Sequence, residues 1–169
     1  MSMIGVAEVR SSVGDKADLR EKYLHSLSLI ERLHRQLLDV IKDDFERRGG
    51  CDINSVQALL LFNIGDEEMT AGELRSRGHY LGSNVSYNLK KLVDGGYIHH
   101  QRSDVDRRSV RVRLTDAGRA VHQRVDELFH RHLESIEAIG GISADEFHQI
   151  NQTLIRLERF WADQIRYRL

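Results

Sequence analysis

The sequence predicts a mainly α-helical protein of the α+β class, and three observations carry this prediction. Two long segments, one towards each end of the chain, repeat apolar residues at spacings of three and four, which is the period of an amphipathic helix. Between them, one pair of short segments alternates apolar and polar residues, which is typical of β-strands. Proline is absent from all 169 residues, so helices are unbroken and turns depend on Gly, Asn and Asp.

The N-terminal part begins with an unpatterned stretch and continues as a long helical one. Residues 1–18 mix Ser, Gly and Val with charges, and we expect a flexible arm there. Residues 19–52 carry a wide apolar stripe that ends at a Gly-Gly pair. A stripe of this length is more than a small domain can cover. We therefore expect it to pair with a second copy of the chain, through residues that include Leu24 and Leu27.

Three helices are predicted in the centre of the chain. Asp52 or Asn54 is placed to cap the first of them. Thr70 and Glu73 have the spacing of a capping box, which predicts that the second helix starts at Thr70. The third has Ser83 as its expected N-cap residue and closes at the next Gly-Gly pair.

The third of these helices divides into two faces. At about 100° per residue, Val85, Leu89 and Leu92 fall together and point inward. The opposite face carries side chains that donate to base edges or phosphates, as expected of a helix in the major groove of DNA. For Tyr87 the alternative role is packing, and for Ser83 it is capping the helix. We assign DNA contacts to Ser83, Asn84, Ser86, Tyr87, Lys90 and Lys91.

A β-hairpin is predicted from the alternating segments 97–102 and 109–114. The loop between them is too polar to be buried. A basic hairpin tip beside a DNA-reading helix can enter the minor groove, so we assign DNA contact to Arg107 and Arg108, with Asp106 holding one arginine in place. An ordinary charged surface hairpin is the alternative. Residues 53–115 thus have the element order of a winged helix-turn-helix.

The net charge of −1 conceals a strongly basic segment. Residues 75–113 contain nine Lys and Arg residues against three Asp residues, which gives this segment a charge of +6 and the remainder −7. A local basic stripe on a neutral chain is the footprint expected of a phosphate-binding surface. A solvated charged face with no ligand is the alternative.

The C-terminal part, residues 116–169, predicts two more helices separated by a Gly-Gly pair. Ser143 and Glu146 have the spacing of a capping box at the start of the second one. We expect residues 19–52 and 116–169 to form a helical dimerisation region, packed with the winged region into one compact domain. On the last helix, the residues assigned to dimerisation are Leu154, Leu157, Trp161 and Ile165.

The motifs GSNVSYNLKKLVDGGYI and DVDRRSVRVRLTDAG resemble those of the MarR family of bacterial transcription regulators, and the resemblance covers residues 20–169. The ending RLERFWADQIRYRL further resembles an LdtR-like branch, linked to L,D-transpeptidase, cell-wall remodelling and stress genes. The resemblance implies a homodimer on pseudo-palindromic double-stranded DNA, and a crevice where a small, often aromatic effector releases the DNA. Tyr87 stands where many members carry arginine, so their base preference does not transfer.

Other chemistries have weaker support. Cys51 is the single cysteine, and the acid beside it disfavours a reactive thiolate. The pairs His122 with Asp126 and His130 with Glu134 share helix faces, but neither has a third metal ligand. No phosphate-binding loop or nucleophile–base pair is recognisable. We therefore expect no enzymatic activity, cofactor or metal. A redox- or metal-gated regulator and a winged-helix adaptor that binds proteins remain the alternatives.

The cellular location is predicted from what the sequence lacks. It shows neither a signal peptide nor an apolar run long enough for a bilayer, and one cysteine forms no internal disulfide. These features favour the cytoplasm, and we expect no membrane partner.

Overall fold

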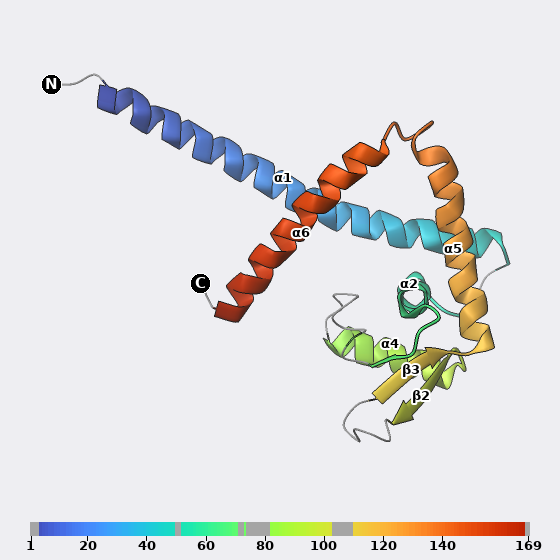
Figure 1. The fold of residues 1–169 in the computed structure, drawn as a ribbon. Coiled ribbons are helices and arrows are strands. Elements are labelled where there is room, and N and C mark those ends of the chain that lie inside the picture. Colours follow the sequence, from blue (N-terminus) through green and yellow to red (C-terminus); the bar gives the residue numbers. More distant parts are fainter. Residues whose placement is uncertain (1–3, 50–51, 71–72, 74–81, 103–109, 168–169) are drawn as a thin grey trace. The chain divides into compact units, whose positions relative to one another are not determined.

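The structure is a computed structural model that describes residues 4–49, 52–70, 73, 82–102 and 110–167 (Figure 1). The chain divides into two compact units, Met1–Val125 and Asp126–Leu169. Helices dominate both, and a small sheet belongs to the first. The predicted mainly α class and the winged helix-turn-helix architecture are confirmed. Within the described part of the chain, none of the helices has the length and apolar character needed to cross a membrane.

The first helix, α1, runs from Ile4 to Arg47 and is longer than predicted. The expected boundary near residue 19 is not seen, because the residues from Ile4 onward continue the helix. A flexible arm over residues 1–18 stays a prediction. Those residues lack an apolar stripe, but they also lack proline. Extending an existing helix by one residue costs far less than nucleating a new one. An ion pair of 2.6 Å between Asp18 and Lys22, one turn apart, supports this exposed part.

Helix α2, Ser55–Ile64, is the most buried element of the first unit. Of the two predicted capping residues, the structure selects Asn54. Its side chain accepts a bond of 2.9 Å from the backbone N–H of Gln57, whose side chain accepts one of 3.0 Å from the backbone N–H of Asn54. Gly65, with φ of 64°, ends the helix.

The sheet has three antiparallel strands in the order β1-β3-β2. Strands β2, Ile98–Arg102, and β3, Val110–Leu114, form the predicted hairpin in the register Ile98↔Leu114 to Arg102↔Val110. Strand β1, Met69–Thr70, was not predicted, because two residues are too few to show alternation. It pairs with β3 in the register Met69↔Val112.

Thr70 is the residue at which strand β1 gives way to the next segment. The predicted capping box is present: the backbone N–H of Thr70 donates to Glu73 at 2.6 Å, and the backbone N–H of Glu73 donates to the Thr70 hydroxyl at 3.1 Å. Thr70 is therefore the last residue of a strand and also makes both bonds of the predicted capping box.

The core of the first unit gathers residues from every one of its elements. It lies where α2, the sheet, α4 (Gly82–Asp94), the C-terminal end of α1 and the start of α5 (Asp116–Ile136) come together. Its apolar side chains shield the sheet from water on one side and hold α4 in place. The most deeply buried are Ile41, Leu60, Leu61, Ile64, Leu92, Val112 and Val125.

Arg124 fastens α5 to the C-terminal end of α1. Its Nη2 donates to the backbone carbonyl oxygens of Asp44 and Phe45 at 3.2 and 3.0 Å. Its guanidinium lies 4.2 Å from the centre of the Phe45 ring, and its Nε lies 3.7 Å from an Asp44 carboxylate oxygen. The carbonyls at the end of a helix have fewer partners than those inside it, so a half-buried cation there adds hydrogen bonds and interacts favourably with the helix dipole.

We predict that Arg124→Leu lowers the free energy of unfolding by about 2–3 kcal/mol, because two carbonyl groups and the half-buried carboxylate of Asp44 lose a charged partner. Arg124→Lys should give a smaller loss, since lysine keeps the positive charge and loses only the planar group that bonds to both carbonyls. The control is Arg47→Leu, which breaks an exposed ion pair of 3.0 Å with Asp43 and should change stability by less than about 0.5 kcal/mol. Urea denaturation of the variants would measure the difference, and equal losses in Arg124→Leu and Arg47→Leu would contradict it.

The second unit contains the end of α5 and helix α6, Ala144–Tyr167. A turn with Gly141 at φ of 67° separates them. The predicted cap of α6 is present: Ser143 donates to the Glu146 carboxylate through its backbone N–H at 2.9 Å and its hydroxyl at 2.7 Å. Those two bonds, in that order, lower the pKa of Glu146.

The predicted apolar stripe of α6 is present as one face of a helix. None of the described residues of α6 is buried. Leu154, Trp161 and Ile165 are 43, 37 and 81% exposed, and Leu157 is half-buried. On α1, Leu24 is 45% exposed and Leu27 is half-buried. Exposed stripes of this size are unusual on a monomer.

Candidate nucleic-acid interface

Helix α4 has one face anchored in the core and one exposed face. Leu89 and Leu92 are 8 and 0% exposed and fix the helix to the core. The residues of the predicted outer face that the structure describes are all exposed: Ser86, Tyr87, Lys90 and Lys91. The division into faces that the helical spacing predicted is therefore present. Whether these side chains contact DNA stays a prediction.

The start of α4 differs slightly from the prediction. The helix begins at Gly82, so Ser83 lies inside its first turn instead of capping it from outside. Asn84 lies in the same turn. The side chains of Ser83 and Asn84 lie outside the described part of the structure. The backbone N–H groups of this turn have no partners within the helix and point along its axis, which is favourable near phosphate.

An interaction that the sequence analysis missed joins two residues of the outer face. Nζ of Lys91 lies over the ring of Tyr87, 5.8 Å from its centre. This distance is within the range of a cation–π contact. The spacing of four residues on a helix, which brings side chains together, was the signal from which it could have been found.

The end of α4 leads directly into the wing. Gly96, at φ of 77°, donates its N–H to the carbonyl of Val93 at 3.0 Å, and Tyr97 donates to the carbonyl of Leu92 at 2.8 Å. This pattern closes a helix through a glycine in the left-handed conformation. It confirms the predicted stop and turns the chain into β2.

Thr115, at the end of β3, joins the wing to both neighbouring helices. Its hydroxyl donates to the carbonyl of Gly96 at 2.7 Å and accepts from the N–H of Gly118 at 3.1 Å, and its own N–H donates to the carbonyl of Tyr97 at 3.1 Å. A Cβ atom on Gly118 would lie 3.2 Å from the carbonyl carbon of Tyr97 and would overlap its oxygen. Only glycine fits there, which gives a physical reason for the Leu-Thr-x-x-Gly ending of the wing motif.

The wing itself is described at its base. Arg111 is exposed and pairs with Glu68 at 3.6 Å, and Arg113 is exposed on the same face of β3. The tip residues assigned to DNA contact, Arg107 and Arg108, and the supporting Asp106 lie outside the described residues. Their roles stay predictions.

The histidine pairs do not assemble a metal site. His122 stacks on Phe62, with ring centres 5.2 Å apart, and His130 lies 3.5 Å from a carboxylate oxygen of Asp126. In the ranges that the structure describes, no three His, Cys, Asp or Glu side chains converge as metal ligands would. Cys51 lies outside those ranges.

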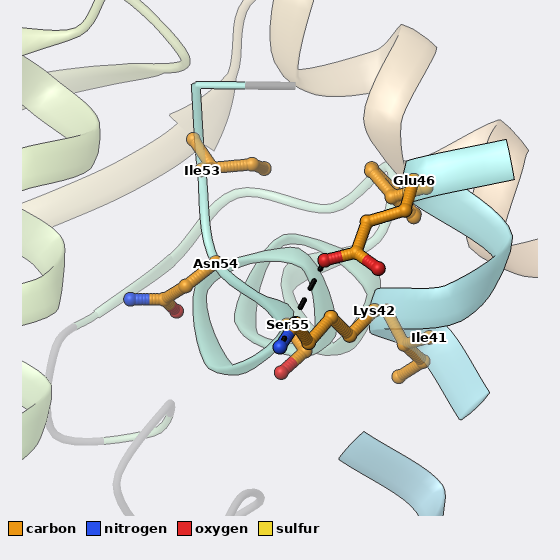
Figure 2. A pocket seen from close by; sticks show the side chains of 7 residues that line it. Ile41, Lys42, Glu46, Ile53, Asn54 and Ser55 are labelled. Atoms are coloured by element: carbon orange, nitrogen blue, oxygen red, sulfur yellow. Dashed lines mark ion pairs between the residues drawn. The ribbon is translucent and has the colours of Figure 1, made fainter. Parts of the chain in front are cut away.

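A pocket of about 220 Å³ lies between the C-terminal end of α1 and the start of α2 (Figure 2). Ile41, Phe45 and Ile53 contribute apolar surface. Lys42 and Glu46 form an ion pair of 3.8 Å across one side of it. The pocket is small, partly open and mainly apolar, which suits a ring-sized organic molecule.

Comparison with known proteins supports the regulator interpretation. Residues 53–118 match the family described as winged helix DNA-binding domain. The exopolysaccharide II synthesis transcriptional activator ExpG of Rhizobium meliloti is 35% identical over 153 residues, which cover 90% of this chain and 78% of that protein.

Two solved structures share the fold. A mutant of MarR from E. coli, complexed with operator DNA, has a TM-score of 0.62 at 22% identity, covering 77% of this chain and 91% of that one. BpsR of Bordetella bronchiseptica, whose DNA binding is regulated by 6-hydroxynicotinic acid, has a TM-score of 0.62 at 17% identity, covering 78% of this chain and 91% of that one.

Proposed function

Because this chain belongs to the MarR family of winged helix transcriptional regulators, which are DNA-binding proteins and not enzymes, we propose that it acts as a homodimer on a pseudo-palindromic operator. In this proposal each α4 enters the major groove and each wing tip enters the adjoining minor groove. A small effector modulates the binding.

The observation that carries the DNA-binding part is the exposed face of α4. Tyr87, Lys90 and Lys91 are free to meet a ligand, while Leu89 and Leu92 hold the opposite face in the core. A packing role for Tyr87 does not agree with its exposure of 62%. Strand β3 adds two exposed positive residues, Arg111 and Arg113. Such a surface recognises a phosphate backbone and offers side chains to base edges.

The dimer is supported by the stripes on α1 and α6. Both are apolar, long and exposed in the single chain. Covering such surfaces with a second copy would remove apolar area from water at about 25 cal/mol per Å². The predicted residues Leu24, Leu27, Leu154, Leu157, Trp161 and Ile165 are assigned to this interface.

The effector is proposed to be a small aromatic molecule. The pocket lined by Ile41, Phe45 and Ile53 has a suitable size and polarity, and BpsR provides a relative in fold that responds to an aromatic acid. Control of cell-wall remodelling and stress genes rests on the sequence resemblance to the LdtR-like branch. Cytoplasmic location follows from DNA as the partner.

The salt dependence of DNA affinity tests this function. Operator fragments would first be selected from random duplexes, and their affinity measured by fluorescence anisotropy between 50 and 200 mM salt, where a protein with several phosphate contacts loses about 10³-fold or more. Lys90→Gln should reduce the slope by about two, one for each subunit. The control Lys22→Gln, on the exposed part of α1, should leave the slope unchanged.

Two outcomes would contradict the proposal. Affinity that does not depend on salt would remove the phosphate contacts from the interface. Selection that yields no preferred sequence would favour the winged-helix adaptor, in which the basic face is incidental.

A further inference from the structure

Tyr87 lies on the side of α4 opposite the core. With about 100° per residue, it is about 160° from Leu89 and about 140° from Leu92, the two side chains that fix the helix. Lys90 and Lys91 flank it, each about 160° from one of these leucines and about 100° from the other. The ring of Tyr87 therefore projects away from the core. When α4 enters a groove, this ring faces the base edges.

The contact between them restricts the ring. Nζ of Lys91 lies 5.8 Å from the ring centre, over one face of Tyr87. A ring held on one face keeps its edge and its hydroxyl available to a ligand. Because it already has fewer rotamers in the free protein, it loses less conformational entropy on binding. Lys91 thus adds positive charge and also orients its neighbour.

Thymine is the base whose chemistry fits an oriented aromatic edge. In the major groove the four bases differ in donors and acceptors, but only thymine presents a methyl group. The Tyr87 ring edge is the large apolar surface on the exposed side of α4. A hydroxyl that both donates and accepts adds little discrimination, whereas an apolar contact with a methyl group separates thymine from every other base.

We propose that Tyr87, held in place by Lys91, recognises the 5-methyl group of one thymine in each half-site. The inference deepens the DNA-binding function proposed above and rests on it. Tyr87 is the specificity-determining residue, and Lys91 is a positioning residue that acts through the ring. The operator accordingly has one position in each half-site at which thymine is preferred because of its methyl group.

Deoxyuridine substitution tests this, because it removes the methyl group and leaves all hydrogen-bonding groups in place. Thymines of the selected operator would be replaced one position at a time, symmetrically in both half-sites. For the wild-type protein, deoxyuridine at one of these positions should weaken binding by about fourfold for each half-site. This is the value expected when one apolar carbon is removed from a contact. Tyr87→Phe should show the same loss, and Tyr87→Ala should show none.

The role of Lys91 is tested with a variant matched in charge. Lys91→Gln and Lys90→Gln each remove one positive charge from the same face, so both should lower affinity. Only Lys91→Gln should also bring the thymine-to-deoxyuridine affinity ratio towards one. An unchanged ratio in Lys91→Gln would overturn the positioning role.

Three results would overturn the methyl contact: no position sensitive to deoxyuridine, the same sensitivity in Tyr87→Ala as in the wild type, or a loss of sensitivity in Tyr87→Phe. The last would assign recognition to the hydroxyl. If the wild-type protein selects no sequence from the random duplexes, the proposed DNA-binding function itself fails. This outcome would be observed before any deoxyuridine is introduced.

Discussion

Replacing Gly118 with alanine is expected to lower the free energy of unfolding by about 3 kcal/mol, at the upper end of the range for overpacking. The new Cβ would overlap the carbonyl oxygen of Tyr97, which is backbone and cannot rotate away. It would also force apart the bonds that Thr115 makes to Gly96 and Tyr97. Urea denaturation would measure the loss. DNA affinity should fall as well, because the base of the wing is displaced from α4.

The control for this prediction is Ala117→Gly, at the preceding, exposed position of α5. Helix propensity alone makes Gly118→Ala stabilising and Ala117→Gly destabilising, each by about 1 kcal/mol. If the close approach of Tyr97 governs the site, Gly118→Ala must lower the free energy of unfolding by more than Ala117→Gly does. Helix propensity alone predicts that Gly118→Ala raises it. A Gly118→Ala protein as stable as the wild type would refute the close approach.

Leu154→Asp is expected to dissociate the proposed homodimer. Two carboxylates would enter the interface, and at about 3 kcal/mol each the dissociation constant should rise by about 10⁴-fold. Sedimentation velocity over a concentration series would measure the change. Operator affinity should fall in parallel, since a monomer has one winged helix-turn-helix and contacts only one half-site.

The control is Gln152→Asp, which adds the same charge about 160° away on α6, opposite the stripe. It should leave the dimer intact. Circular dichroism would separate dissociation from unfolding. A wild-type protein that sediments as a monomer, or a Leu154→Asp protein that remains dimeric, would refute the interface.

Local signals explain what could be predicted from the sequence. The caps at Asn54, Thr70 and Ser143, and the stop at Gly96, depend on residues within one turn of each other, and all of them are present. The two faces of α4 likewise follow from helical spacing alone. The N-cap at Ser83 was misplaced by one position or more, because the helix already includes Gly82.

Distant contacts explain what could not be predicted. Arg124 bonds to carbonyls 79 and 80 residues away, and nothing in the spacing of the sequence connects them. The need for glycine at position 118 arises from a carbonyl on the far side of the hairpin. Strand β1 exists because β3 offers it a partner. The part of α1 before residue 19 has no apolar stripe by which the sequence could indicate a helix. It extends a helix that is stabilised by the residues after it.

The hydroxyl of Thr115 has a mechanical consequence. By bonding to Gly96 and capping α5, it ties the end of α4, the base of the hairpin and the start of α5 into one stiff joint. If α4 and the wing contact DNA as proposed, they therefore do so as one rigid unit. In the proposed homodimer, we expect an effector to change the distance between the two winged units and to leave each unit intact. Operators whose half-sites are moved apart by a single base pair would therefore respond differently to the same effector.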